Sequence, residues 1–278
     1  MPFSYYFDIG DRDHISSCSR TINRINQLEI MITKNNESAS SGYCRFCGKT
    51  HYLEQGKAGE HCLNLMKALA ENGRIDFHVP EQEADPRLSL DYIKGEARGQ
   101  MFGVLECMGP DGQPVILKAF SGQYNGVWNV EGWAPPLLDI EKFDSLVSDA
   151  DKQIKALGNR ITGLPEGLER QELTRKRKTL SQNLMKEIHA LYRVHNFRSE
   201  VRSLFDFFEN GIPTGAGDCC APKLLNAAAK QKLAPKSLAE IFWGRTNRAG
   251  TRRQGKYYVA CPEKCQPILG FMLCGIGR

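Results

Sequence analysis

The sequence has no apolar run long enough to span a membrane, and its first residues lack the basic start and apolar stretch of a secretory leader. We therefore expect a cytoplasmic protein with no membrane partner. Its 10 cysteines would then meet a reducing environment, where clustered thiols bind metal more often than they form disulfides. With 278 residues, 41% of them hydrophobic and 25% charged, the chain is long enough for one large globular domain or two smaller ones.

Two catalytic patterns are also missing. No H-N-H pattern is visible among the 6 histidines, which disfavours a nuclease with a histidine base on a metal-binding hairpin. The H-x-E and P-C-x-x-C signature of zinc-dependent nucleobase deaminases is absent in that form. The sequence instead contains cysteine clusters at other spacings, and the functional prediction starts from these clusters.

Two of the clusters lie near the C-terminus, and each stands where a helix is expected to begin. The run Gly217-Asp-Cys-Cys-Ala-Pro-Lys-Leu-Leu225 opens a segment with helical apolar spacing, and Cys261 and Cys265 follow a strand-like segment. A helix N-terminus lowers the pKa of a cysteine and favours the thiolate that binds zinc. Cys219 or Cys220, together with Cys261 and Cys265, therefore supplies three ligands of a catalytic zinc, with one position left for water.

A zinc site of this kind also needs a carboxylic acid that moves protons without binding the metal. In nucleobase deaminases this acid stands two residues after the first ligand. Here Ala221 or Pro222 occupies that position. The nearest candidate acid is Asp218, and Glu240 on an expected neighbouring strand is the second choice. A site that neither acid reaches would be structural or inactive.

A third cluster, Tyr43-Cys-Arg-Phe-Cys-Gly-Lys49, is typical of a zinc knuckle. The residues after it do not begin a helix cleanly, which disfavours a redox C-x-x-C motif. We expect a closed structural zinc site with Cys44, Cys47, His61 and Cys62 as ligands; the alternatives are His51 and the pair His14 and Cys18. Three isolated cysteines are expected to be small buried hydrophobes: Cys18, Cys107 and Cys274.

The remaining pattern predicts an α/β fold. Two apolar runs within 101–120, joined by an Asp-Gly turn, predict a β-hairpin that precedes the two ligand helices. Helical spacing over 140–157 and 168–208, with a break at 162–167, predicts an antiparallel helical hairpin that projects from the sheet. Nucleobase deaminases carry such ligand helices on a mixed sheet with helices on its faces. We therefore predict a cytidine-deaminase-like mixed sheet with flanking helices.

This interpretation divides the chain into three parts. They are a small N-terminal zinc module at 1–95, a deaminase-like domain at 96–138 and 211–278, and the helical hairpin as an insertion at 139–210.

Basic residues gather in two segments of a chain whose net charge is +5. One lies just after the turn of the helical hairpin and the other lies between Glu240 and Cys261. Such clusters bind nucleic-acid phosphates, although acidic neighbours allow the first to be an ordinary solvated helix face. The candidate RNA contacts are Arg175, Lys176, Arg177, Lys178, Lys223, Arg245, Arg248, Arg252 and Arg253.

Several of these segments together resemble a known family. They are Gln100–Leu105, Ala119–Gly122, Gly217–Leu225, Leu238–Gly244, and Cys261 and Cys265 with the following Pro267–Gly270. The segments resemble the region that precedes the synthase domain in long RluA-type RNA pseudouridine synthases. The chain is most similar to the bifunctional tRNA editors of that family, in which a deaminase-like region converts cytidine to uridine before the synthase domain makes pseudouridine.

The resemblance implies a zinc-dependent tRNA cytidine deaminase. It also implies a pseudouridine synthase domain as partner, in cis or in trans, because this chain has no H-R-L-D-type synthase segment. The alternative is a catalytically inactive, zinc-containing RNA-binding module of such a synthase.

Overall fold

The computed structural model describes residues 40–277, and these residues belong to one compact unit. His14 and Cys18 lie outside the described residues. The strands are β1 (Ser40–Cys44), β2 (Lys49–Leu53), β3 (Gln100–Met108), β4 (Pro114–Phe120), β5 (Val194–His195), β6 (Val201–Arg202), β7 (Ala234–Trp243) and β8 (Lys256–Tyr257). The helices are α2 (Ala58–Asn72), α3 (Asp91–Lys94), α4 (Ile140–Thr162), α5 (Leu168–Ala190), α6 (Cys220–Lys230) and α7 (Gln266–Met272), with short 3-10 turns at Glu81–Glu83, Pro86–Leu88 and Leu204–Asp206.

The central sheet has the strand order β4-β3-β7-β8, and every neighbouring pair is antiparallel. The predicted β-hairpin is its β3–β4 pair. The mixed sheet expected from the sequence is not found among residues 40–277. A parallel neighbour needs a long crossover between two adjacent strands. Here β7 instead turns back through the loop 244–255 into the short β8, so this edge of the sheet is antiparallel.

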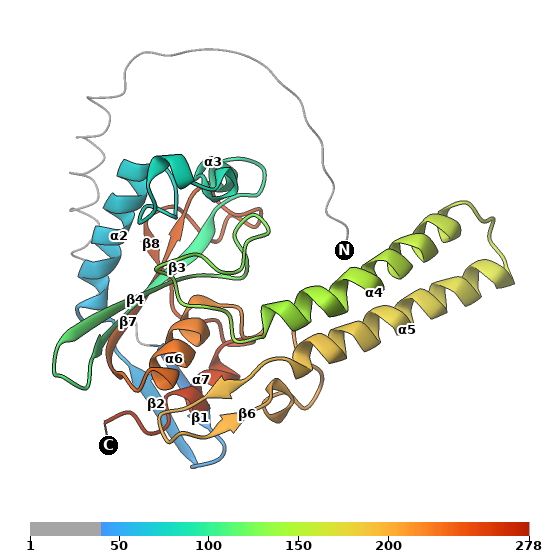
Figure 1. Cartoon of the computed structure of the whole chain (residues 1–278). Coiled ribbons are helices and arrows are strands. Elements are labelled where there is room, and N and C mark those ends of the chain that lie inside the picture. The colour runs from blue at the N-terminus through green and yellow to red at the C-terminus, as the bar shows by residue number, and fades with distance from the viewer. Residues whose placement is uncertain (1–39, 278) are drawn as a thin grey trace. The chain divides into compact units, whose positions relative to one another are not determined.

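Helices cover both faces of this sheet, as the predicted flanking helices require (Figure 1). Successive residues of a strand point to opposite faces. Gly103 of β3 faces α6, and a Cβ atom there would lie 2.7 Å from the Cβ of Cys220. Val104 faces α2, where it lines a cavity with Leu65. The missing side chain at Gly103 therefore lets the start of α6 lie close against β3.

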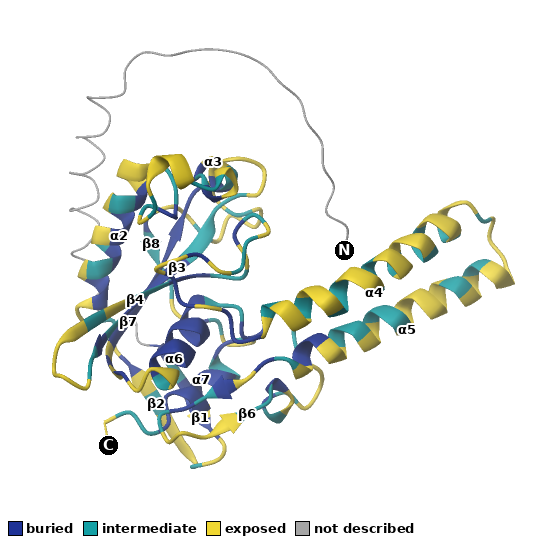
Figure 2. Cartoon of the chain, in the orientation of Figure 1, coloured by how far each residue is buried: buried dark blue, intermediate teal, exposed yellow. Residues whose placement is uncertain are grey.

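The predicted helical hairpin is confirmed by α4 and α5, which pack together and project from the rest of the unit (Figure 1). The second helix is shorter than the predicted range 168–208: α5 ends at Ala190, because the chain then turns into the β5–β6 pair. The Asp139 carboxylate accepts a hydrogen bond from the Lys142 amide and caps the start of α4. No residue of α4 is buried, and most of the hairpin is exposed or half-buried (Figure 2). Its surface is therefore open to a partner along most of its length.

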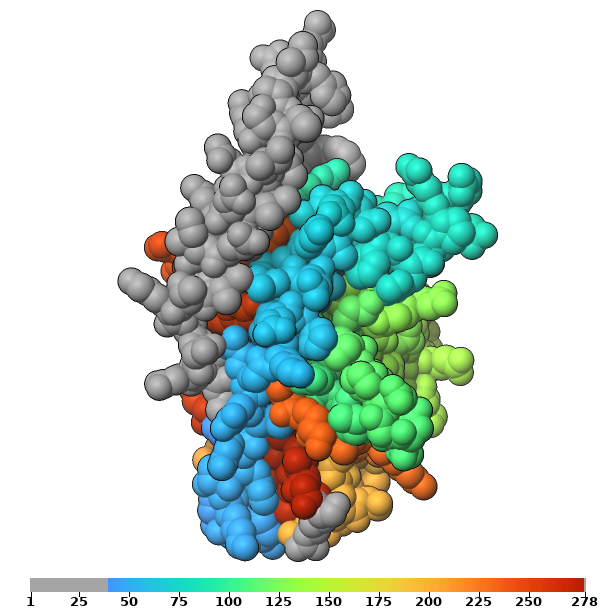
Figure 3. Space-filling model, turned by 90° about the vertical axis from the view of Figure 1, so that its left-hand side faces the viewer, coloured from blue at the N-terminus to red at the C-terminus, as the bar shows by residue number. Residues whose placement is uncertain are grey.

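The β1–β2 hairpin packs against α7 rather than standing apart (Figure 3). Their backbones touch, because a Cβ on Gly42 would lie 2.4 Å from the Gly270 nitrogen and a Cβ on Gly270 would lie 2.3 Å from the Tyr43 backbone. Segments from the two ends of the described chain thus form one contact. The domain boundaries at 95, 138 and 210 stay predictions. No helix among residues 40–277 is long and apolar enough to cross a membrane.

Candidate metal centre

The first candidate site consists of Cys219, Cys261 and Cys265, and we call it the three-thiol site. Their sulfur atoms all lie within 4.8 Å of one another. Cys219 is the N-cap of α6, so the predicted helix start is confirmed there. Cys265 is the N-cap of α7, so the second helix begins one turn later than the start expected at Cys261. Cys261 precedes α7 by one turn, and its carbonyl accepts a hydrogen bond from the Cys265 amide at 3.2 Å. Cys265 is buried, whereas Cys219 and Cys261 are half-buried.

Hydrogen bonds join the three sulfurs, and the Cys261 and Cys265 sulfurs lie 3.5 Å apart. Hydrogen bonds with Cys219 and Cys265 lower the pKa of Cys261. The hydrogen bond with Cys261 raises the pKa of Cys219, although the one with Cys265 lowers it, and hydrogen bonds with Cys219 and Cys261 both raise the pKa of Cys265. A metal ion would find all three sulfurs already close to one another.

Cys220 is the predicted alternative to Cys219 as a zinc ligand. It is fully buried between α6 and the sheet, and its thiol donates to the Met101 carbonyl at 3.3 Å. Burial raises the pKa of this thiol well above its usual value. Cys220 does not belong to the ligand group, so the structure selects Cys219.

Glu240 brings a carboxylate to the same helix start from the neighbouring strand β7. Its Oε1 accepts a hydrogen bond from the backbone N–H of Ala221 at 3.1 Å. Ala221 stands two residues after Cys219, where the deaminase signature has its acid. Burial raises the pKa of Glu240 to about 7, against the lowering effects of the Ala221 N–H and Arg252, and the charge of Cys261 raises it further. The carboxylate therefore lies within electrostatic reach of the three-thiol site.

Asp218, the acid nearest in sequence, is turned to a different partner. Its Oδ1 accepts a hydrogen bond from the Tyr192 hydroxyl at 2.7 Å, and its backbone carbonyl accepts one from the Gly122 amide at 2.7 Å. Burial raises the pKa of Asp218, although the Tyr192 hydroxyl and Lys223 oppose this shift. Asp218 thus connects the start of α6 to the residues after α5.

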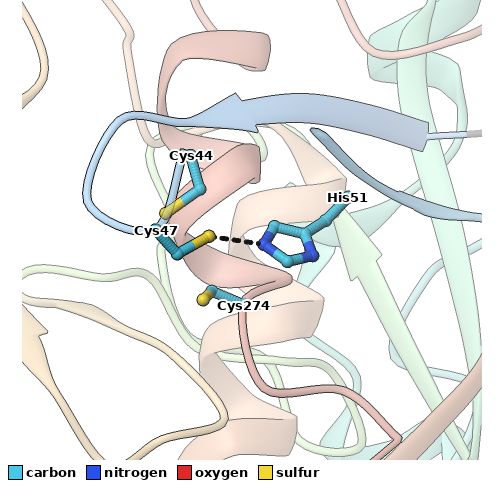
Figure 4. Close-up of side chains that lie close together, drawn as sticks. All are labelled: Cys44, Cys47, His51 and Cys274. Atoms are coloured by element: carbon cyan, nitrogen blue, oxygen red, sulfur yellow. Dashed lines mark hydrogen bonds between the residues drawn. The ribbon is translucent and has the colours of Figure 1, made fainter. Parts of the chain in front are cut away.

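The second candidate site contains Cys44, Cys47, His51 and Cys274, and we call it the four-residue site (Figure 4). Their ligand atoms all lie within 4.8 Å of one another, and the Cys47 sulfur is 3.1 Å from His51 Nε2. Burial raises the pKa of Cys47, but hydrogen bonds, the strongest with His51, lower it by more, to about 6. The sequence motif therefore does mark a cysteine group able to hold a metal ion.

The partners predicted for Cys44 and Cys47 need correction. His61 and Cys62 lie on α2 and do not belong to the group. Cys62 is fully buried, and its thiol lies 3.6 Å from the Ala239 carbonyl oxygen, because it sits on the face of α2 that packs on the sheet. Cys274 was expected to be an isolated hydrophobe, yet its sulfur faces the other three residues (Figure 4). No local sequence pattern marks Cys274 as a partner, apart from its being a cysteine.

The predicted RNA contacts have different environments. Lys223 is fully buried, and its ammonium donates to the carbonyls of Phe120 and Gly122, so it is not available to an RNA phosphate. Arg252 is half-buried, lies 4.8 Å from the Tyr258 ring and helps set the pKa of Glu240. The others are exposed: Arg175, Lys176, Arg177 and Lys178 on α5, and Arg245, Arg248 and Arg253 after β7, with Arg245 paired to Glu96.

Comparison with known proteins adds no further information about the site. No model of a known protein family matches the chain, and neither a curated protein nor a solved structure matches it.

Proposed function

We propose that the three-thiol site holds a catalytic zinc ion and that the protein hydrolyses cytidine to uridine in a tRNA loop, as a first step toward pseudouridine. The observation that carries this proposal is the meeting of three thiols and one buried carboxylate at the starts of two helices. These are the ligand number and the acid that a zinc deaminase needs.

The donor set fits zinc. Thiolate sulfur is a preferred zinc ligand, and three protein ligands are the number found in catalytic sites, which keep one position for water. Among residues 40–277 this site brings together three candidate ligand atoms, whereas the four-residue site brings together four. When bound, zinc lowers the pKa of a water ligand and so supplies a nucleophile at neutral pH.

Glu240 is the residue that we propose moves the proton. The hydrogen bond from the Ala221 N–H fixes one of its oxygens, and the other oxygen, Oε2, would take a proton from the attacking water. Glu240 would return this proton to the cytosine ring at N3 as the water oxygen bonds to C4. It would then take the second proton of the attacking water and pass it to the amino group, which leaves C4 as ammonia while the new C4–oxygen bond becomes a carbonyl. Burial suits the role, because a carboxyl with a pKa near neutrality can both accept and donate a proton.

The RNA part of the proposal rests on the family resemblance and on charge. Three exposed arginines lie in the segment between Glu240 and Cys261, so residues of the site precede and follow them in the sequence: Arg245, Arg248 and Arg253. A base inside a folded RNA must be extruded before it can react, and phosphate contacts hold the backbone while this happens. A synthase domain, in cis or in trans, would then act on the uridine.

One observation favours the alternative, an inactive RNA-binding module that keeps its metal for structure. The acid two residues after the first ligand is replaced by Ala221, and Asp218 is hydrogen-bonded to Tyr192. On this alternative Glu240 would serve only to cap α6.

The experiment incubates the protein with total tRNA and measures ammonia release and cytidine-to-uridine conversion by sequencing. Cys261→Ser removes one thiol of the site, and Cys107→Ser is the matched control because Cys107 is buried on β3 and belongs to neither group. We expect conversion by the wild type and the control but not by Cys261→Ser. Zinc-loaded wild type that binds tRNA without converting any cytidine would replace this proposal with the binding module.

A further inference from the structure

The four-residue site closes a loop between distant parts of the chain. Cys44 ends β1, Cys47 lies in the turn, His51 lies on β2 and Cys274 comes from the C-terminal end of the chain (Figure 4). The turn is tight, since the Gly48 amide donates to the Cys44 carbonyl at 2.8 Å and Gly48 has a φ of 69°. Three thiols and one imidazole are the number and kind of ligands that structural zinc sites use.

Cys274 lies just past the end of α7, which joins the two candidate sites. The helix has Cys265 of the three-thiol site as its N-cap and ends at Met272, two residues before Cys274. A helix of seven residues is too short to be stable alone, so its position depends on its packing. That packing includes the contact between Gly42 and Gly270, which leaves no space for a single added methyl group.

We propose that the four-residue site binds one zinc ion as a closed structural centre and, by tying the end of α7 to the β1–β2 hairpin, holds Cys265 in place for the three-thiol site. His51 and Cys274 are the ligands that complete it. The positioning half of this proposal rests on metal binding at the three-thiol site, which is part of the proposed function. It does not depend on deamination.

The coupling follows from the geometry of the helix. Packing and a thiol hydrogen bond between Cys47 and Cys274 connect the end of α7 to the hairpin. Movement of α7 along the hairpin would shift Cys265 relative to Cys219, which sits on a different helix. Supporting groups that orient metal ligands typically change metal affinity by about 10 to 100-fold.

The experiment counts zinc per chain in the purified full-length protein and measures Co²⁺ affinity by thiolate charge-transfer absorption. His51→Gln removes a half-buried ligand, and His61→Gln is its matched control on α2. Cys274→Ser is the second test of the closed centre, and Cys261→Ser removes the other site. Far-ultraviolet circular dichroism confirms that each variant is folded.

We expect two zinc ions in the wild type and in His61→Gln. His51→Gln and Cys274→Ser should lose the ion of the closed centre and weaken Co²⁺ binding at the three-thiol site by about 10-fold or more. Cys261→Ser should leave the closed centre with unchanged affinity. If folded His51→Gln and Cys274→Ser proteins keep two zinc ions, the four-residue site is not the closed zinc centre. If they lose one ion but bind Co²⁺ at the three-thiol site with unchanged affinity, the closed centre does not position Cys265. Because no substrate is used, failure of deamination is a separate result.

Discussion

Replacing Glu240 by glutamine separates the chemical role of this carboxylate from its structural one. The amide oxygen of glutamine can still accept the hydrogen bond that the Ala221 N–H now donates at 3.1 Å, so the start of α6 and the three thiols should stay in place. The variant loses only the ability to take up and return a proton. General acid–base catalysis typically contributes about 10² to 10⁴-fold to a rate, which corresponds to about 3 to 5 kcal/mol of activation free energy.

We therefore expect Glu240→Gln to bind zinc like the wild type and to convert cytidine about 10² to 10⁴-fold more slowly in single-turnover assays. Asp218→Asn is the matched control, because its amide oxygen can still accept the Tyr192 hydroxyl hydrogen bond, and it should keep nearly the full rate. A Glu240→Gln protein with the wild-type rate, or an equal loss in Asp218→Asn, would refute the assignment of the proton carrier.

Three further predictions follow from the packing and charges. Gly103→Ala puts a methyl group 2.7 Å from the Cys220 Cβ and should lower the free energy of unfolding, measured in urea, by about 1 to 3 kcal/mol. Gly158→Ala on α4 is the control: the nearest atom to its added methyl group is 3.8 Å away, so it should not destabilise the protein. Burial lowers the pKa of Lys223 from 10.5 to about 8, so between these pH values the unfolded chain binds more protons than the folded one. The free energy of unfolding of the wild type should therefore rise with pH in this range, and Lys223→Met should lack the rise. Parallel plots of unfolding free energy against pH for the two proteins would contradict the burial effect. If all four residues from Arg175 to Lys178 contact phosphate, changing them to glutamine should make the slope of log binding constant against log salt concentration shallower by about 3 for tRNA. An unchanged slope would mean that this face of α5 contacts solvent and not RNA.

Much of the local structure is readable from the sequence because it depends on neighbouring residues. The helical start at Cys219 follows from the glycines before it and the apolar spacing after it, and the helical hairpin follows from its break at 162–167. The hairpin of β3 and β4 follows from the turn at Asp111 and Gly112. These features need no knowledge of the distant chain.

The ligands that were missed depend on tertiary contacts. Cys274 joins Cys44 only because α7 packs on the β1–β2 hairpin, a contact between opposite ends of the described chain. The choice between Cys219 and Cys220 depends on the rotation of α6 against β3, and the hydrogen bond from Ala221 to Glu240 depends on β7 being the neighbouring strand. No local pattern contains these facts, and the same is true of the burial of Lys223.

The central claim is that the three-thiol site holds zinc with an open coordination position. A crystal structure of the zinc-loaded protein, with anomalous diffraction collected at the zinc edge, tests it directly. We expect a zinc ion about 2.3 Å from the sulfurs of Cys219, Cys261 and Cys265, with a solvent molecule as its fourth ligand. Absence of zinc from this site, or a fourth ligand supplied by Cys220 or Glu240, would contradict the account.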